Sequence, residues 1–519
     1  MKKNLGKRLL CSGLAVAMAG TVLAGCGSGG SGSTQTTGQQ SEGTDAGDTA
    51  AASSEAPEGE PVELTLFLDN MNIVDGSYAK TEIEKATNTK LNIIQAAPAE
   101  MDNKLNIMLA SGEIPDIFQC ETETMEGKLL SSGILLPYNE YWDNYPNIKN
   151  GRSEETWDLM RYKDGNIYSI GVESQNPLYI MGYRKDWLDK FGMEIPTTLD
   201  EYYAFAEKCA KEDPDGNGVD DTFAFGGYTP LLFQWMDHIF GAFGVLPNYW
   251  MEVDGQIIDG AVLPGAKDAL VFLNRMYENG LIDPEFVTDD AYRWQSKVKQ
   301  GIFGAGITKL QIFDKNNWRN YYAPFIQSNP DGEWAYGPVL QGGCDNPVGE
   351  RMESRRGWVR TFVYKDSPNV EAALRVIDYL MSDEGNMFVI YGKEGEHYKW
   401  EGDKVVRLIS NEEVQELDLE KFFIAQKNLF YHSSDEVLDA MEFLSQPGMA
   451  TPNPIEGIFI DELSTIYPDL QDLTITRFTE MIIGEVPVEE GFDKFVEEWY
   501  SSGGTELLEA VNQAYKEWK

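Results

Sequence analysis

The sequence predicts an α/β protein built as two lobes. The chain from Pro61 to Lys519 is too long for one compact core and suits two lobes. Strand-like and helix-like segments alternate from Val62 onward, which is the pattern of a largely parallel sheet. The longest apolar stretch of this part, Leu231 to Leu246, is interrupted by polar residues and is not a membrane span. We therefore expect an α/β fold with two lobes.

The N-terminus has the pattern of an export signal. An apolar stretch from Leu9 to Leu23 follows four basic residues, and it is too short and too rich in small residues for a membrane span. The sequence Leu23-Ala24-Gly25-Cys26 resembles the lipobox of bacterial lipoproteins. That resemblance implies a signal peptide over residues 1–25, cleavage before Cys26, and acylation of the Cys26 sulfur and its new amino group. The alternative is an ordinary secretory signal with an incidental cysteine.

Residues 26–60 are predicted to form a disordered tether. The segment from Gly27 to Glu60 consists almost wholly of Gly, Ser, Thr, Gln, Ala, Asp and Glu, without aromatic or branched aliphatic residues. Such a segment cannot bury enough surface to offset the entropy lost on ordering. We expect it to carry the folded part away from the membrane.

Charge and cysteine content exclude several classes of partner. The formal net charge of −43 repels nucleic acid and anionic lipid, so we expect no nucleic-acid partner and membrane contact through the lipid anchor only. Cys120, Cys209 and Cys344 are too widely spaced for a disulfide framework or a CxxC metal site. We expect each of them to be a small buried residue. We also expect the protein to be a monomer.

The first predicted lobe opens with alternating strand and helix patterns. The expected elements are a strand at Val62–Leu68, a helix around Tyr78–Ala86, a strand at Leu91–Ile94, a helix at Met101–Ala110 and a strand at Asp116–Phe118. Ligands bind beyond the carboxyl ends of the strands in such sheets. Asp69, Asn70 and Gln119 are therefore candidate ligand-binding residues, and the alternative is that they are polar turn residues.

Later helices carry clear boundary signals. Thr198 and Glu201 form a capping box that opens a helix through Ala210. Pro264 precedes a helix from Ala266 to Glu278, and Gly280 ends it. Ser367 and Pro368 are expected to be the N-cap and the first residue of the helix Val370–Met381.

Several motifs occur in order along the chain. They are Leu109-Ala-Ser-Gly-Glu-Ile-Pro-Asp-Ile-Phe118, Lys163-Asp-Gly-Asn-Ile-Tyr168, Tyr183-Arg-Lys-Asp-Trp-Leu-Asp-Lys-Phe-Gly192, Ile195-Pro-Thr-Thr-Leu-Asp-Glu-Tyr202, Asp213-Pro-Asp-Gly-Asn-Gly218, Gly280-Leu-Ile-Asp-Pro-Glu285 and Tyr379-Leu-Met-Ser-Asp-Glu-Gly385. Together they resemble the extracellular solute-binding protein family 1 of carbohydrate ABC importers, especially its alginate-oligosaccharide-binding-like members.

That resemblance implies a two-lobe fold like that of periplasmic binding proteins, with a ligand cleft between lobes joined by hinge strands. It also implies permease subunits of an ABC importer as partners, and no covalent chemistry. We expect an N-terminal lobe of residues 61–181 with about 302–365, and a C-terminal lobe of residues 182–301 with about 366–519.

The segment after the Thr198 helix has the spacing of an EF-hand-type calcium loop. Carboxylate and amide oxygens stand at positions 1, 3 and 5, a glycine at position 6 and a backbone carbonyl at position 7. Ala224 stands where an EF-hand has its final Glu. By resemblance to the alginate-binding-like proteins, two residues just after position 7 close the site. The expected ligands of a structural Ca²⁺ are Asp213, Asp215, Asn217, Val219, Asp221 and Thr222, and the alternative is a solvated turn.

Aromatic residues are candidates for holding a sugar. They make up 12% of the chain, and sugars present apolar faces that stack on aromatic rings. The candidate set is Tyr183, Tyr228, Trp235, Trp250 and Trp358, and for each a core or surface role is the alternative.

A basic cluster stands directly before Trp358. Arg356 is a candidate for gripping the carboxylate of a uronate. An ion pair at the surface is the favoured alternative.

We therefore expect a lipid-anchored protein at the cell membrane, facing outside the cytoplasm, that captures an oligosaccharide for an ABC importer. One alternative is a surface lipoprotein that binds a peptide or another ligand for signalling. The other is a glycoside-processing enzyme with paired carboxylates. The chain has three histidines and, in its folded part, no HExxH, CxxC or GxSxG motif, which argues against an enzyme.

Overall fold

The structure is a computed structural model that describes residues 59–173, 179–228, 232–313, 322–352, 354–402, 404–427 and 435–518. The predicted signal peptide, Cys26 and nearly all of the predicted tether lie outside the described residues. No helix within these ranges is long and apolar enough to cross a bilayer.

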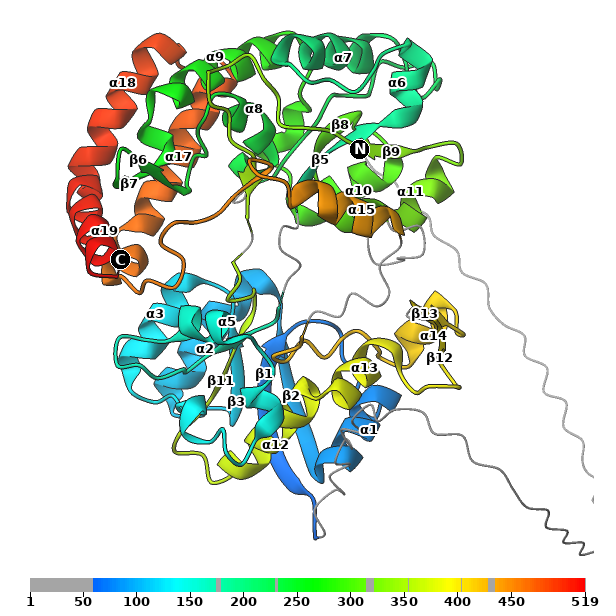
Figure 1. The fold of residues 1–519 in the computed structure, drawn as a ribbon, viewed down its shortest axis with the longest axis vertical. Helices are drawn as coiled ribbons and strands as arrows, with labels where there is room; N and C mark the ends of the chain where they lie inside the picture. The colour runs from blue at the N-terminus through cyan, green and yellow to red at the C-terminus, as the bar shows by residue number, and fades with distance from the viewer. Residues whose placement is uncertain are drawn as a thin grey trace, which may run out of the picture. The chain divides into compact units, whose positions relative to one another are not determined.

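The first lobe is built on a five-stranded sheet of order β2-β1-β3-β11-β4 (Figure 1). β1 is parallel to β2 and β3, and β11 is antiparallel to both β3 and β4. The strands are β1 (Val62–Asp69), β2 (Thr89–Ala96), β3 (Ile117–Cys120), β4 (Ile170–Gly171) and β11 (Arg360–Val363). The helices are α1 (Tyr78–Thr87), α2 (Pro98–Ser111), α3 (Glu123–Ser132), α4 (Pro146–Lys149), α5 (Glu154–Met160), α12 (Val370–Met381), α13 (Asp383–Tyr391) and α14 (Asn411–Glu416), and a hairpin joins β12 (Tyr398–Glu401) to β13 (Lys404–Arg407).

Alternation along β1 divides the core of this lobe between the two faces of the sheet. Leu64, Leu66 and Leu68 are buried in a cluster with residues of α1 and α12. Phe67, which points to the opposite face because side chains alternate along a strand, packs in a cluster with residues of α2 and α3. The strand and helix predictions of the sequence for this lobe are thus confirmed within a few residues at each boundary.

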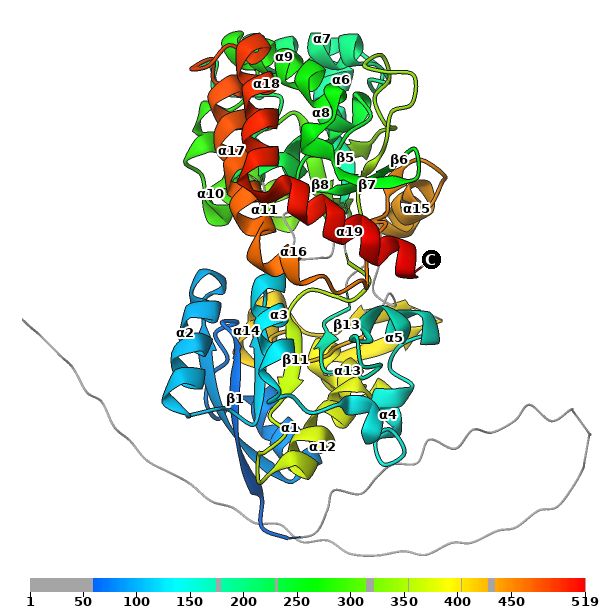
Figure 2. The same ribbon diagram turned by 90° about the vertical axis from the view of Figure 1, so that its left-hand side faces the viewer.

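The second lobe has a three-stranded sheet of order β8-β5-β9 and one large core cluster. Its strands are β5 (Tyr179–Arg184), β6 (Trp250–Val253), β7 (Gln256–Asp259), β8 (Ala305–Lys309), β9 (Trp334–Tyr336), β10 (Glu350–Arg351) and β14 (Ala450–Thr451). Its helices are α6 (Lys185–Phe191), α7 (Leu199–Lys211), α8 (Asp237–Ala242), α9 (Pro264–Glu278), α10 (Ala291–Gln300), α11 (Tyr322–Ser328), α15 (Asp435–Leu444), α16 (Asp461–Thr465), α17 (Tyr467–Ile482), α18 (Val488–Trp499) and α19 (Thr505–Trp518). Figure 2 shows α17, α18 and α19 following one another along one side of this lobe.

The predicted lobe boundaries need correction. The described residues between 302 and 350 belong to the second lobe, because β8 and β9 both pair with β5. Residues 366–427 belong to the first lobe, because α12 and the residues up to Ala425 pack in a core cluster with β1. Among the described elements, consecutive ones therefore belong to different lobes at three places: β4 and β5, β10 and β11, and α14 and α15.

The capping contacts agree with one predicted helix start and differ from another. Thr198 caps α7 as predicted: its hydroxyl accepts from Glu201 N at 3.2 Å, and the Glu201 carboxylate accepts from Thr198 N. The prediction for α12 was wrong by two residues, since Asn369 is the N-cap. Ser367 Oγ instead accepts from Asn369 N and donates to Asp116 at 2.5 Å, because its tertiary partner competes with the cap.

Candidate functional site

The carboxyl ends of β1 and β3 carry the polar side chains that the sequence placed there. Gln119 Oε1 accepts from Asp69 N at 3.2 Å. Gln119 Nε2 donates to Thr361 Oγ1 at 3.2 Å and to the Phe423 carbonyl at 2.5 Å. Gln119 is 1% exposed, so the structure uses this side chain to join β1, β3 and β11 and not to face a ligand.

Asp69 and Asn70 differ in their surroundings. Asp69 is buried, its Oδ1 has no hydrogen-bond partner among the described residues, and burial raises its pKa. Asn70 is exposed, and its Oδ1 accepts from Asn72 N at 3.1 Å. Glu121, directly after β3, was missed by the sequence analysis. Burial, together with the charges of Asp69 and Asp102, raises the pKa of Glu121 to about 7.

In the second lobe, two of the predicted aromatic residues come together with two others. The rings of Trp235 and Trp294 pack at a tilt with centroids 4.2 Å apart, and the Tyr228 ring lies 5.4 Å from Trp235 and 5.6 Å from Trp294. Tyr179 meets Trp235 edge-on at 5.9 Å. Tyr228 is partly exposed, whereas Trp235 and Trp294 are buried. Trp294 and Tyr179 join Trp235 only through the tertiary fold, so no local pattern could have identified them.

The remaining aromatic candidates have different positions. Tyr183 is fully buried and packs edge-on against Tyr202 and Phe205, so it belongs to the core and not to a ligand surface. Trp358 is partly exposed and lies 5.5 Å from Phe423.

Arg356 is held by a carboxylate of its own lobe. Its Nη2 lies 2.5 Å from Glu126 Oε1, and Arg360 Nε lies 3.2 Å from the other oxygen of Glu126. Ser169 Oγ donates to Glu126 at 2.9 Å. Burial would raise the pKa of Glu126, but the charges of Arg356 and Arg360 outweigh it and lower that pKa. The ion-pair alternative for Arg356 is therefore the one observed, although the pair is buried.

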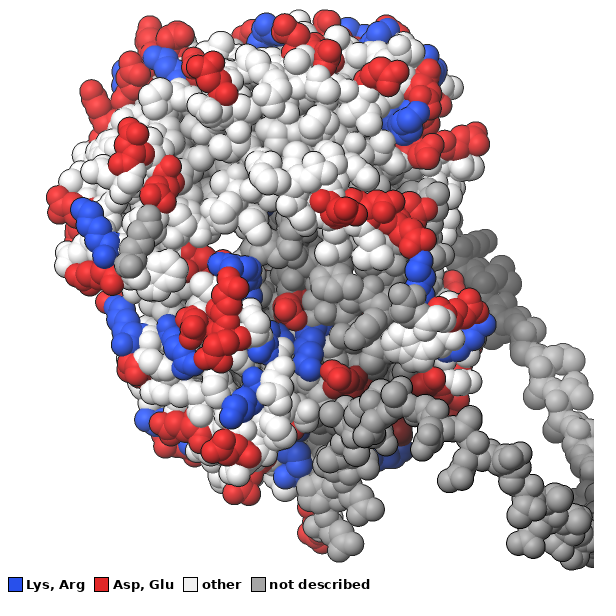
Figure 3. All heavy atoms as spheres, viewed as in Figure 1, with Lys and Arg blue, Asp and Glu red and all other residues white. Residues whose placement is uncertain are grey.

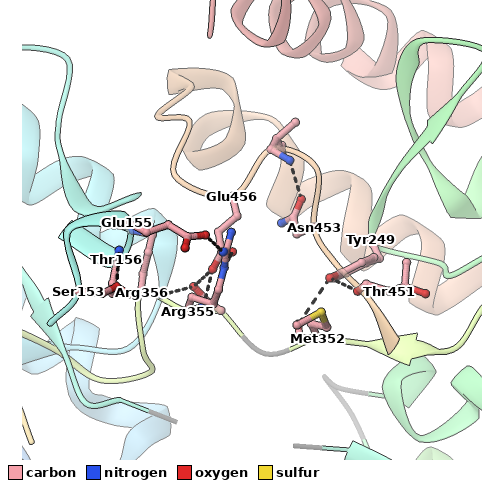
Figure 4. Close-up of polar contacts among 12 residues, drawn as sticks. Ser153, Glu155, Thr156, Tyr249, Met352, Arg355, Arg356, Thr451, Asn453 and Glu456 are labelled. Atoms are coloured by element: carbon pink, nitrogen blue, oxygen red, sulfur yellow. Dashed lines mark hydrogen bonds and ion pairs between the residues drawn. The ribbon is translucent and has the colours of Figure 1, made fainter. Parts of the chain in front are cut away.

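Arg355 joins three segments of the chain (Figure 4). Its Nη1 donates to Glu155 of α5 at 2.7 Å, and its Nε donates to Glu456 at 2.8 Å. Its backbone N also donates to Glu456, and Ser354 Oγ donates to the same carboxylate at 3.1 Å. The crossing segment before β11 is thus tied both to the first lobe and to the chain after β14.

These segments surround a cavity of about 420 Å³ with walls from both lobes. This volume lies in the range of small-molecule sites. Trp250 lines it and packs at a tilt against Tyr467 with ring centroids 4.9 Å apart. Asn248, Asn453 and Glu456 supply polar groups. The other lining residues include Glu123, Glu126, Tyr162, Tyr249, Met352, Arg355, Arg356 and Phe459.

The side-chain oxygens of the loop after α7 are held by hydrogen bonds within the loop. Asp213 Oδ2 accepts from Gly218 N at 3.0 Å, and Asp215 Oδ1 accepts from Asn217 N at 3.2 Å. Asn217 Nδ2 donates to both Asp215 and Asp221 at 3.0 Å. Burial and the nearby carboxylates of Asp213 and Asp221 raise the pKa of Asp215.

Two members of the predicted calcium set contribute differently from the rest. The Thr222 hydroxyl donates to the Cys209 carbonyl at 2.5 Å, so this hydroxyl is engaged by the end of α7. Val219 is 57% exposed, and its N donates to Asn217 Oδ1 at 2.7 Å. Among the described residues, no group of three or more His, Cys, Asp or Glu side chains is arranged to hold a metal ion. Asp213 Oδ1 is buried and has no hydrogen-bond partner in the same part of the chain.

Comparison with known proteins defines the class. The family model described as "Bacterial extracellular solute-binding protein" matches residues 72–387. The chain belongs to this family, as the sequence motifs had predicted.

Individual relatives extend the match to most of the chain. The polygalacturonan/rhamnogalacturonan-binding protein YtcQ of Bacillus subtilis is 26% identical over 84% of this chain and 88% of its own length. The crystal structure of the alginate-binding protein AlgQ2 without calcium ion has a TM-score of 0.71 at 18% identity, covering 89% of this chain and 99% of that one. An EF-hand mutant of the Streptococcus pneumoniae protein FusA, solved with fructo-nystose, has a TM-score of 0.72 at 19% identity and covers 88% and 99%. These structures share the two-lobe fold of this protein.

Proposed function

We propose that the protein captures an oligosaccharide outside the cytoplasm and delivers it to an ABC importer. The observation that carries the proposal is a cavity with walls from both lobes, lined by Trp250 and Arg356 of the candidate residues and close to the segments that join the lobes. A ligand that contacts both lobes stabilises one arrangement of the lobes over others by its differential contacts. The sugar ligands of YtcQ and FusA support an oligosaccharide as this ligand.

The ligand surface combines aromatic rings with a few polar groups. Tyr228, with Trp235 beneath it, and Trp358 offer partly exposed ring surface in the two lobes, and Trp250 offers a ring inside the cavity. Asp69 and Asn70 supply oxygens at the carboxyl end of β1. Rings that stack on apolar sugar faces and carboxylates that accept from hydroxyls are the groups by which proteins hold sugars.

The N-terminal pattern supports a lipid anchor. Acylation of Cys26 would hold the protein at the membrane, and the polar segment up to Glu60 would give the lobes reach toward the permease. The expected binding unit is a monomer that contacts the membrane through its acyl chains alone.

We also propose a structural Ca²⁺ in the loop after α7. Asp213, Asp215, Asn217 and Asp221 would hold it through side-chain oxygens, and Val219 through its carbonyl. The unpartnered oxygen of Asp213 and the mutual proximity of the carboxylates fit a hard cation, which prefers a shell of oxygens. The Thr222 hydroxyl is left out of this set because it donates to Cys209.

Binding without turnover is part of the proposal, since the family consists of solute-binding proteins. Incubation with oligosaccharides followed by chromatography is expected to return each sugar intact. Release of shorter products would replace the binding function with that of a glycosidase.

The first experiment is a thermal-shift screen of the purified protein against oligosaccharides, amino acids and peptides, with and without calcium. A ligand at 100 times its dissociation constant adds about 2.7 kcal/mol to the free energy of unfolding. Stabilisation by saccharides supports the proposal. Stabilisation by peptides alone would favour the signalling lipoprotein and remove the oligosaccharide as ligand.

A further inference from the structure

The arginines at and between β10 and β11, here called the crossing segment, are each paired with a carboxylate. Arg351 donates to both oxygens of Asp237 at 2.7 Å, and Arg356 and Arg360 share Glu126. Arg355 lies between Glu155 and Glu456. A ligand carboxylate that approached this segment would have to compete with one of these internal partners.

The carboxyl ends of the first-lobe strands, by contrast, carry acidic side chains that are not paired with basic ones in the described part of the chain. The charges of Asp69 at the end of β1 and of Asp102 in α2 both act on Glu121, which follows β3. None of the three forms an ion pair with a basic side chain among the described residues, although Arg360 Nη1 donates to the Glu121 carbonyl at 2.9 Å. Asp69 is 7% exposed, and burial is the first cause of the raised pKa of both Asp69 and Glu121, although the charge of Arg360 acts to lower the pKa of Glu121.

Hydrogen-bond donors at this edge reach only some of its acceptors, since Thr122 Oγ1 donates to Asp102 Oδ2. The Oδ1 atoms of Asp69 and Asp102 are both buried without a partner among the described residues. A buried acceptor without a donor is costly, so the edge gains when a ligand supplies one.

An aromatic side chain, Trp358, is connected to the same edge through packing and hydrogen bonds. The Phe423 carbonyl accepts from Gln119 Nε2, and Gln119 Oε1 in turn accepts from Asp69 N. Phe423 packs against the partly exposed Trp358. A chain of contacts through Gln119 and Phe423 therefore links the backbone N–H of Asp69 to Trp358, whose ring can support the apolar face of a sugar.

We propose that the ligand is an uncharged oligosaccharide, whose hydroxyl groups donate to the carboxylates of Asp69 and Glu121, and that uronic acid residues are excluded at this edge. Hydroxyls provide the missing donors without bringing charge. A uronate would bring a further negative charge toward Asp69, Asp102 and Glu121. Among the arginines of the crossing segment it would find each one already paired. This inference rests on the oligosaccharide-binding function proposed above.

Figure 3 shows how the acidic and basic side chains are distributed over one face of the molecule. Basic side chains on the first lobe lie interleaved with acidic ones, and a row of acidic side chains runs over α15 in the second lobe. The sequence of α15 carries Asp435, Glu436, Asp439 and Glu442. No broad basic surface that would attract a polyanionic sugar is visible on this face.

The test compares two ligands that differ only in charge. Isothermal titration of the purified protein at pH 7.5 would use α-1,4-linked galactose oligomers and α-1,4-linked galacturonate oligomers of equal length, with fructo- and malto-oligosaccharides as further neutral probes. We expect a neutral series to bind and the galacturonate series to bind at least about tenfold more weakly, since a charged hydrogen-bond partner is worth that much. Tighter binding of galacturonate than of every neutral series would overturn the inference and leave the oligosaccharide-binding function standing. Failure of every saccharide would remove both.

Variants then test the residues. Glu121→Gln and Asp69→Asn are each expected to weaken neutral-sugar binding by about tenfold or more. The ratio of the affinity for the neutral sugar to the affinity for galacturonate should become smaller. Glu371→Gln is the matched control, because it removes the same charge from an exposed position in the first turn of α12 and should change neither affinity. If both edge variants bound the neutral sugar and galacturonate as the unaltered protein does, Asp69 and Glu121 would not be the acceptors.

Discussion

Two acidic clusters of the second lobe contain the same number of carboxylates but are neutralised in different ways. In one cluster, Lys297 Nζ lies 2.6 Å from Asp283, 2.7 Å from Glu285 and 2.6 Å from Asp289. The other is the loop after α7, with Asp213, Asp215 and Asp221. There the carboxylates accept hydrogen bonds from backbone N–H groups and from the Asn217 amide.

The difference lies in where the positive charge comes from. Lys190, the lysine at the loop, donates to the carbonyls of Asp213 and Pro214. The Lys297 cluster therefore carries its own cation, whereas the loop would take one from solution under the calcium proposal. If so, the stability of the loop should depend on calcium and that of the Lys297 cluster should not.

The largest expected effect comes from removing the internal cation. Lys297→Met leaves Asp283 and Asp289, both nearly inaccessible to solvent, without their partner. Breaking a buried pair in this way costs about 3–5 kcal/mol. Chemical denaturation measures this loss, with or without calcium. Lys494→Met, at an exposed position of α18, is the control and should change stability by less than about 0.5 kcal/mol. A loss of less than about 1 kcal/mol for Lys297→Met would mean that the two clusters do not differ as argued.

The second effect concerns the cation taken from solution. Calcium at 100 times its dissociation constant should add about 2.7 kcal/mol, and a chelator should remove it. Asp215→Asn should abolish this response in a thermal-shift assay, because it removes one ligand charge. Asp220→Asn, in the same loop but outside the predicted ligand set, should retain it. Equal responses of both variants to chelator would argue against the proposed ligands.

A smaller effect is expected at the helix that leads into the loop. Thr198→Ala removes the N-cap of α7 and should cost about 1 kcal/mol. The calcium response should survive, because the cap lies at the opposite end of α7 from the loop. Denaturant titration at saturating calcium measures the loss. A vanished calcium response would mean that the loop and the helix start are coupled.

The smallest expected effect is an absence of pH dependence. Burial would lower the pKa of Lys297, but its hydrogen bonds with Asp283, Asp289 and Glu285 outweigh burial and raise it. A lysine with a raised pKa contributes its full stability below its unfolded pKa of about 10.4 and loses it only as pH rises through the folded value. The stability difference between the unaltered protein and Lys297→Met should thus be constant from pH 7 to 10. A decline within that window would contradict the raised pKa.

Local chemistry made several features of this protein predictable. The capping box of Thr198 and Glu201 involves groups three residues apart, so no distant contact is needed to form it. The alternation of Leu64, Leu66 and Phe67 likewise fixes which side of β1 each side chain occupies. The order of the motifs along the chain identified the family, which the comparison confirmed.

The candidate site was less predictable because its partners are distant in sequence. Arg356 and Glu126 are 230 residues apart, and nothing near either one signals the pair. The same holds for Trp235 and Trp294, which meet only when the second lobe folds. Gln119 was predicted to face a ligand, yet its amide joins three strands of one sheet.

The sequence by itself determined the α/β class, the helix starts set by adjacent residues, and the oxygen-rich spacing of the loop from Asp213 to Asp221. Only the tertiary structure decided that β8 and β9 pair with β5, that residues 366–427 return to the first lobe, and which charges are neutralised. The physical reason is range. Caps, turns and alternation follow from hydrogen bonds and geometry within a few residues, whereas strand pairing and buried ion pairs depend on which distant segments share a core.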